Sequence, residues 1–321
     1  MIGRRLEHGD VVWRWVLILM SAMVILLMLS IGWMLWTRSE EARAAFGFTF
    51  IIPTLDANWD PVSSVFQAWP FIYGTLLTSI AAILIAVPIS LGVAIFLAEL
   101  SPAWLRTPLG WLVELLASVP SVVYGLWGIF VFLPKVVAPL GFFLQNTLGQ
   151  VPGLSLIFGG PIPESGASRL AAGLILAIQI IPTISAVSRD VFQAIPNNQR
   201  EASLALGATR WETIWQVLLP YGLSGILGAV ILGLGRALGE TMAVTMVIGN
   251  STQSNPSLLL PGYTMSSIIA NEFAEAVSSV HSSALIEIGF VLFIITLLLN
   301  LLARFLVWQV ARKTPTQEAR V

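Results

Sequence analysis

The stretch IYGTLLTSIAAILIAVPISLGVAIFL, residues 72–97, contains no charged side chain from end to end. A helix needs about 20 apolar residues to cross the ~30 Å hydrocarbon core of a bilayer, whereas a membrane strand needs only about 10. The stretch is therefore long enough for a membrane-spanning helix. We expect Pro88 to kink this helix, because proline removes a backbone hydrogen bond. The length of the stretch favours a helical bundle over a β-barrel.

The composition of the whole chain agrees with a membrane protein. Of its 321 residues, 56% are hydrophobic and only 10% are charged, whereas a soluble domain has about 25% charged residues. The net charge of -1 provides no basic field that would attract nucleic acid. The chain has no cysteine, and its two histidines, His8 and His281, lie far apart in the sequence. These counts predict no metal site, because such sites need three or four protein ligands.

Six apolar spans are found along the sequence, which predicts an all-α integral membrane protein with six transmembrane helices. The first span is too long for the apolar region of a signal peptide and ends in polar residues, so we interpret it as an uncleaved anchor. Residues 38–70 are polar, and residues 134–167 are rich in proline and glycine, so both segments are predicted to be loops on the outer side. The predicted spans are 15–36, 72–97, 112–133, 170–188, 221–248 and 285–308.

The distribution of positive charge predicts the orientation of these spans. Most lysines and arginines between the spans fall on the side of the N-terminus, whereas the opposite side has only Arg38, Arg43, Lys135 and Arg169. Cytoplasmic loops are enriched in lysine and arginine. We therefore expect both termini to be cytoplasmic, with residues 309–321 forming a short cytoplasmic tail.

The cytoplasmic segment AIPNNQREASLALGATRWETIWQVLLP, residues 194–220, is the most informative part of the sequence. We expect Asn198 to cap a short helix over residues 199–206, with Glu201 as its capping-box partner. Gly207 would end this helix in a left-handed turn, and a second short helix would begin at Arg210. The segment could be merely a helical loop with ordinary caps.

The order of residues within this segment is more specific than a cap. Glu201, Ala202 and Ser203, followed by Gly207 and then by Leu219-Pro220, resemble the EAA signature with which ABC-importer permeases dock on their ATPase subunits. Ser203 replaces the second alanine, and serine is small enough to keep helices close together. The resemblance implies an ATPase-coupling role for these residues and for Arg210.

Three further stretches, residues 114–132, 228–250 and 266–276, resemble the phosphate-importer permeases of the PstC type. This resemblance implies the type I ABC-importer transmembrane fold, with an anchor region 1–70, a five-helix core 71–308 and an EAA coupling loop 196–220. It implies a non-enzymatic subunit that translocates inorganic phosphate across the bacterial cytoplasmic membrane. The expected partners are a sister permease (PstA type), two ATPases (PstB type) that bind ATP and Mg, and an extracytoplasmic phosphate-binding protein (PstS type). This chain would itself hold no cofactor.

Arg236 and Glu240 are separated by four residues within the fifth predicted span, so they would share one face of a helix. A charged residue in the bilayer interior costs about 2.5–3.5 kcal/mol on insertion scales, and it usually faces a partner or a water-filled path. We hypothesise that Arg236 meets phosphate during translocation and that Glu240 neutralises or gates it. The resemblance implies the same role for these positions. A structural ion pair is the alternative.

Two other functions remain open at this point. The chain could be a transporter or channel driven by an ion gradient, but such proteins usually have inverted repeats or ionisable residues in several spans. The sequence shows one central pair and no convincing internal repeat. An ABC permease for another oxyanion is the second alternative.

Overall fold

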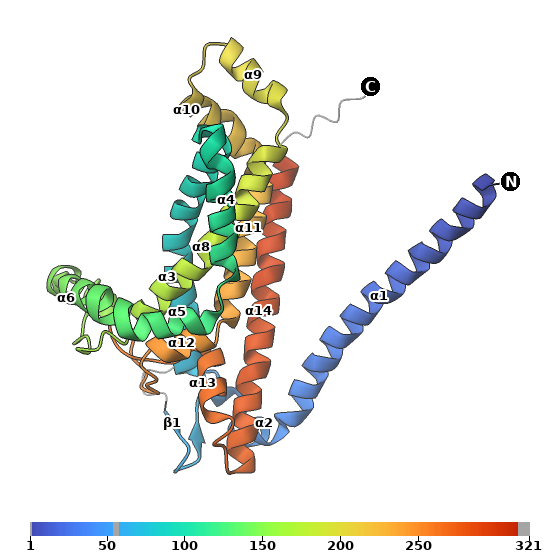
Figure 1. The fold of residues 1–321 in the computed structure, drawn as a ribbon. Coiled ribbons are helices and arrows are strands. Elements are labelled where there is room, and N and C mark those ends of the chain that lie inside the picture. The colour runs from blue at the N-terminus through green and yellow to red at the C-terminus, as the bar shows by residue number, and fades with distance from the viewer. Residues whose placement is uncertain (1, 54–57, 314–321) are drawn as a thin grey trace.

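The computed structural model of the protein describes residues 2–53 and 58–313, most of which are helical (Figure 1). Within these residues, six helices are long and apolar enough to cross a membrane, which confirms the predicted fold class and number of spans. The predicted cytoplasmic tail begins inside the last helix, which ends at Lys313, and residues 314–321 lie outside the described residues. The candidate spans are Val12–Arg38, Trp69–Leu100, Ser121–Gln150, Arg169–Ala194, Arg210–Gly239 and Ser279–Gln309.

A pair of short strands separates the first two helices from those that follow. In chain order, the elements are α1 (Ile2–Arg38), α2 (Glu40–Phe46), β1 (Trp59–Asp60), β2 (Val65–Phe66), α3 (Trp69–Ile95), α4 (Ala103–Ser118), α5 (Ser121–Trp127), α6 (Ala138–Thr147), α7 (Ser155–Phe158), α8 (Arg169–Ala194), α9 (Asn197–Ala205), α10 (Arg210–Thr213), α11 (Leu219–Gly239), α12 (Met242–Val247), α13 (Met265–Glu272) and α14 (Ser279–Lys313). The π-helical turns are Phe96–Leu100, Gly128–Val137 and Ile214–Leu218, and the 3-10 turns are Gly47–Phe50 and Leu148–Gln150.

Helices α3, α4, α8, α11 and α14 form the bundle seen in Figure 1, and α8 is its central helix. Of the most apolar window of α8, 67% is buried, whereas the corresponding window of α1 has no buried residue. Small residues let α3 approach α8 closely: a Cβ atom added at Gly173 would lie 3.2 Å from the Ala81 side chain. Ser90 on α3 donates a hydrogen bond to the Ile181 carbonyl on α8 (3.2 Å).

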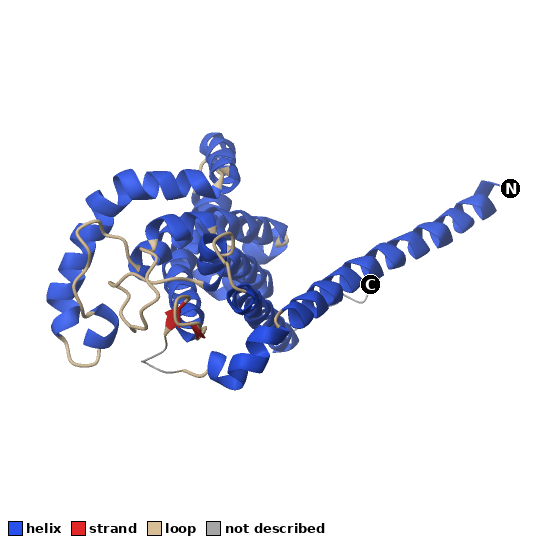
Figure 2. Ribbon diagram, turned by 90° about the horizontal axis from the view of Figure 1, so that it is seen from below, coloured by secondary structure: helices blue, strands red, loops and turns tan. Residues whose placement is uncertain are grey.

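The third predicted span, residues 112–133, is wrong in its bounds. Helix α4 ends at Ser118, and both Val119 and Pro120 have extended backbone angles. A proline disfavours helical geometry at the preceding residue and cannot donate a backbone hydrogen bond. The chain therefore turns sharply at Pro120, and α5 to α6 run across the lower end of the bundle and curve around it (Figures 1 and 2).

Residues 134–150 are predicted to belong to an outer loop, which could include an interfacial turn; the loop conformation is wrong for these residues. They are helical, and they complete the candidate span Ser121–Gln150. Pro139 lies in the first turn of α6, directly after the π-helical turn. Pro134 lies in the π-helical turn, a hydrogen-bonding pattern that differs from that of an α-helix. The two prolines are therefore accommodated where the chain is π-helical or has just returned to α-helix, and neither of them ends the helix.

The predicted outer segment 38–70 folds into a small cap at the lower end of the bundle. Its strands β1 and β2 pair antiparallel, with Trp59 opposite Phe66. The two rings are in edge contact and join a buried cluster with residues of α3, α13 and α14. The Trp59 indole N–H donates to the Glu272 carboxylate (2.8 Å), which also contacts His281 (3.0 Å).

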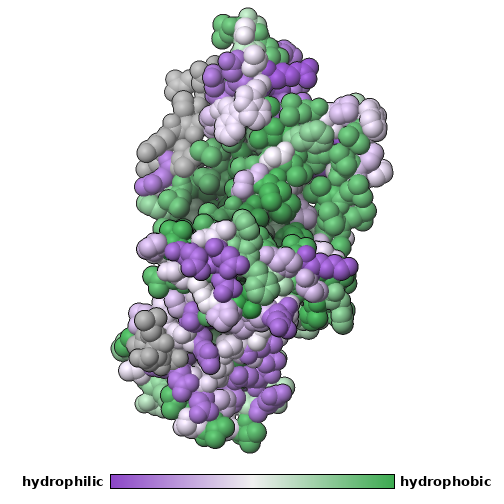
Figure 3. Space-filling model, turned by 90° about the vertical axis from the view of Figure 1, so that its left-hand side faces the viewer, coloured by the Kyte–Doolittle hydropathy of each residue, from purple (hydrophilic) through white to green (hydrophobic). Residues whose placement is uncertain are grey.

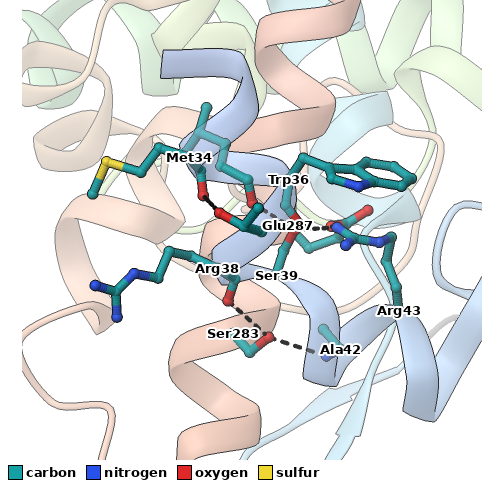
Figure 4. A network of polar contacts seen from close by, with 10 residues as sticks. Met34, Trp36, Arg38, Ser39, Ala42, Arg43, Ser283 and Glu287 are labelled. Carbon is teal, nitrogen blue, oxygen red and sulfur yellow. Dashed lines mark hydrogen bonds and ion pairs between the residues drawn. The ribbon is translucent and has the colours of Figure 1, made fainter. Parts of the chain in front are cut away.

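A polar network joins the first two helices to α14 (Figure 4). Arg43 on α2 forms an ion pair with Glu287 on α14 (3.2 Å), and its guanidinium carbon lies 3.7 Å from the centre of the Trp36 ring. The backbone N–H of Ala42 donates to the Ser283 hydroxyl (3.0 Å). These contacts fix the elbow between α1 and α2, from which α1 diverges from the bundle (Figure 1).

The surface has the banded pattern of a membrane protein. On the face shown in Figure 3, a tip with both hydrophobic and hydrophilic residues lies above a broad hydrophobic region, and hydrophilic residues return in the lower part of the molecule. The tip is formed by α9 and α10, and the lower part contains the cap and the segments next to α13 (Figure 1).

Candidate functional site

Helix α9 and the helix that follows it form the predicted EAA segment at the upper end of the bundle (Figure 1). The residue at the N-cap position of α9 is Pro196, without a side-chain cap, so the predicted capping box of Asn198 and Glu201 is wrong. A capping box is found instead at the start of α10, where Thr209 and Glu212 cap each other's backbone N–H groups. The sequence pattern Thr-x-x-Glu at residues 209–212 is typical of a capping box and could have predicted this one.

The predicted coupling residues lie together on this tip. Glu201, Ala202 and Arg210 are exposed, and Gly207 ends α9 with a φ of 89°, as predicted. Ser203 is half-buried, and its hydroxyl lies 2.9 Å from the hydroxyl of Thr213, so the serine in place of the second alanine joins α9 to α10. The first apolar side chain beyond α9, Leu206, is 90% exposed.

Two residues beneath this tip were missed by the sequence reasoning. Arg200 lies on α9 and Glu99 lies in the π-helical turn that follows α3, and their closest contact is 2.7 Å. Arg200 also donates to the backbone carbonyls of Phe192 and Ile195 at the end of α8 (both 2.6 Å). In the sequence, Arg200 stood out only as one of the cytoplasmic positive charges.

The second predicted site lies inside the bundle. Arg236 is half-buried on α11, and its guanidinium donates to the Thr183 hydroxyl on α8 (3.2 Å). Helix α11 ends at Gly239, and Glu240 has extended backbone angles, so the predicted common helical face is wrong. The Glu240 carboxylate accepts a hydrogen bond from the Ala243 N–H (3.3 Å). Within the described part of the chain, Glu240 forms no ion pair with Arg236.

The geometry at Arg236 suits an anion. Its guanidinium is held by a neutral hydroxyl, so its positive charge is not cancelled by a contact with a carboxylate among the described residues. A guanidinium offers a planar fork of donors that matches the oxygens of phosphate or carboxylate. Glu240 lies just beyond the end of the same helix, where its backbone carbonyl accepts a hydrogen bond from Ser266 (2.9 Å). The structure therefore places the Arg236 guanidinium against α8 and the backbone of Glu240, four residues along the chain, against α13.

Arg169, which was predicted to lie on the outer side, is fully buried at the first turn of α8. Its guanidinium donates to the carbonyls of Ser257 (3.0 Å) and Gln253 (3.4 Å). Buried backbone carbonyls need hydrogen-bond donors, and Arg169 supplies donors to these two carbonyls of an irregular segment. Arg169 thus holds the segment between α12 and α13 against the bundle. No group of three or more potential metal ligands occurs among the described residues.

Comparison with known proteins gives a consistent result. Residues 90–314 match the family described as binding-protein-dependent transport system inner membrane component. The chain is 46% identical over 280 residues to the phosphate transport system permease protein PstC of Xylella fastidiosa, covering 87% of this chain and 84% of the relative. It is 46% identical to PstC of Haemophilus influenzae, covering 90% of each chain.

The fold has a counterpart among solved structures. The chain is similar to a chain of the bacterial alginate ABC transporter crystallised in complex with an alginate-bound periplasmic protein. The TM-score is 0.58 at 18% identity, over 92% of this chain and 94% of the other. At this identity the similarity concerns the fold alone.

Proposed function

Because this chain belongs to the family of binding-protein-dependent transport system inner membrane components, we propose that it is the permease subunit through which an ATP-driven importer moves inorganic phosphate. Two relatives that are 46% identical are phosphate transport permeases, and the match covers most of the length of each. The chain is a multi-pass membrane protein and a translocation subunit. An importer driven by an ion gradient does not fit a family defined by transport that depends on a binding protein.

The structural observation that carries the proposal is the position of α9. All its residues are described, none of them is buried, and the helix protrudes from the end of the bundle (Figure 1). A helix of nine residues is marginal in water without packing. A second chain that packs on α9 would stabilise it, and an ATPase that docks on the EAA residues Glu201, Ala202, Ser203, Gly207 and Arg210 would be that chain.

The partners follow from this assignment. The permease would pair with a sister permease of the PstA type and would dock on two ATPases of the PstB type, which bind ATP and Mg. A phosphate-binding protein of the PstS type would deliver phosphate at the end of the molecule where the cap lies. The predominance of arginine and lysine on the side of α9 supports cytoplasmic termini in the bacterial inner membrane.

The transport cycle would use alternating access. ATP binding would close the ATPase pair, draw the coupling segments together and switch the pathway from inward- to outward-facing. Phosphate would then meet Arg236, whose guanidinium is oriented by Thr183. Glu240 would offset the positive charge when no anion is present. Affinity at this point must stay low so that the anion can leave.

The test is uptake of labelled phosphate in cells that lack their own high-affinity system and express this chain with its partner subunits. We expect ATP-dependent uptake with the wild type, and its loss with Arg236→Gln or with Glu201→Ala while the proteins still reach the membrane. A matched control is Arg106→Gln, an arginine in the first turn of α4 that donates to the Ser101 carbonyl (3.3 Å). Uptake that persists in Arg236→Gln would refute the assignment of the anion site.

A further inference from the structure

We infer that Arg200 and Glu99 form the joint that transmits movement of α9 to the membrane helices. The inference rests on the proposed docking of an ATPase on α9. If α9 is pushed or pulled by another chain, the movement must reach the bundle through the contacts that hold α9. These contacts are few, and one of them is far stronger than the others.

Helix α9 buries none of its nine residues, so apolar packing cannot anchor it. Within the described part of the chain, two of its side chains are hydrogen-bonded to residues beyond the connecting turns: Ser203 and Arg200. Ser203 reaches Thr213 at the end of α10, which belongs to the same protruding tip. Of these two side chains, Arg200 is the one that reaches the turn following α3.

The contact of Arg200 with Glu99 is bidentate. Its Nε lies 3.2 Å from both carboxylate oxygens, and its Nη2 lies 2.7 Å from Oε1. The side chains are 18% and 15% exposed, so water screens the pair only weakly. A paired arginine and carboxylate in this fork geometry hold a fixed orientation as well as a fixed distance.

The same guanidinium also closes the end of α8. The last carbonyls of a helix have no partner within the helix and carry partial negative charge. Arg200 donates to the Phe192 carbonyl, which also accepts from the Ile195 N–H, and to the carbonyl of Ile195, the first residue after α8. It therefore binds the end of α8 while it binds Glu99. Phe192 and Ile195 also pack in a buried cluster with Ile95 and Ile214. One side chain of α9 is therefore fixed to a junction of three membrane segments.

Helix α8 carries the movement further. Thr183, the partner of Arg236, lies nine residues before Phe192 on this helix, which corresponds to about 14 Å along its axis. A displacement of the end of α8 would therefore shift the hydroxyl that orients Arg236. Arg200 is thus a positioning residue, which acts on the anion pathway through α8.

The experiment uses the assembled complex reconstituted in liposomes with its binding protein and measures phosphate taken up per ATP hydrolysed. The variants are Arg200→Ala and Glu99→Gln. The matched control is Glu114→Gln, which removes the charge of a carboxylate on α4 that is 54% exposed, pairs with Arg189 on α8 (3.0 Å) and forms no ion pair with α9. Co-purification of the ATPase subunits with each variant reports assembly.

We expect both variants to retain the ATPase and to hydrolyse ATP, while phosphate uptake per ATP falls by about tenfold or more, a typical size for coupling between sites. Glu114→Gln should keep the wild-type ratio. An unchanged ratio in the variants, or loss of the ATPase subunits on purification, would overturn the inference, because the pair would then be dispensable or merely structural. A wild-type complex without ATP-dependent uptake would instead refute the proposed function.

Discussion

Gly74, near the N-terminal end of α3, lies so close to a neighbouring segment that even one methyl group should disturb it. A Cβ atom added at Gly74 would lie 2.0 Å from the carbonyl oxygen of Tyr263, whereas real Cβ atoms essentially never come within 3.0 Å of another atom. The carbonyl would have to move by about 1 Å. It is held on both sides, because Met265 N–H donates to Thr75 (2.8 Å) and Asn271 donates to the Tyr263 hydroxyl (2.6 Å).

The expected cost of Gly74→Ala is about 1–3 kcal/mol, the usual range for overpacking a well-packed site. Gly92→Ala is the matched control in the same helix, because an added Cβ there meets no described atom within 4 Å. Both variants gain about 0.5–1 kcal/mol because alanine replaces glycine within a helix. The difference between their unfolding free energies therefore reports the clash with the Tyr263 carbonyl alone. We expect Gly74→Ala to unfold several degrees below Gly92→Ala in thermal denaturation of the purified protein.

Phosphate uptake should also fall more in Gly74→Ala than in the control. The displaced segment leads into α13, where Ser266 donates to the Glu240 carbonyl at the predicted anion site (2.9 Å). If Gly74→Ala unfolds at the temperature of Gly92→Ala or above it, the close approach of α3 to this segment is refuted.

Three further changes test other parts of the structure. Gly207→Ala should lower phosphate uptake, because an alanine in the left-handed conformation costs about 1–2 kcal/mol and no described atom within 4 Å adds a clash; uptake equal to wild type would contradict this. Glu287→Gln should lower the unfolding free energy by about 1–3 kcal/mol, since its ion pair with Arg43 is largely but not fully buried, and an unchanged thermal midpoint would count against the elbow. Burial raises the pKa of Tyr263 above its ordinary value, so its contribution to stability should be complete below about pH 10 and be lost as the pH rises through the folded-state pKa. Thermal midpoints measured along an alkaline pH series should show this loss, and Tyr263→Phe should make it smaller; an equal loss in Tyr263→Phe would contradict the assignment.

The membrane spans were predictable because length and hydropathy suffice to recognise a helix that crosses a bilayer. The third span failed because the apolar stretch 112–133 continues through the break at Pro120 without a change in hydropathy. Hydropathy shows which residues are apolar, but it does not show in which direction the helix axis runs. The direction changes because Val119 and Pro120 adopt extended angles, which end one helix before the next begins.

The two sites were predictable to different degrees. Glu201 to Gly207 follow a local pattern, and the structure brings them together on one tip. The Arg236 and Glu240 face was wrong because a spacing of four implies a common face only while the helix continues, and α11 ends at Gly239. The Arg200 and Glu99 contact joins residues 101 positions apart, a tertiary contact for which the sequence has no periodic signal. The functional roles of the predicted residues remain predictions.

The exposure of α9 affects how easily the sequence of this helix can change during evolution. A segment that buries no residue contributes almost nothing to the stability of its own chain, so substitutions on its surface leave folding unaffected. Its sequence is free to follow changes in the ATPase that covers it, and new pairs of permease and ATPase can arise without a stability cost to the permease. Two residues are excluded from this freedom: Arg200, which is fixed to the bundle, and Ser203, whose hydroxyl contacts Thr213. A permease could therefore be assigned to a different ATPase by exchanging the other residues of a single short helix.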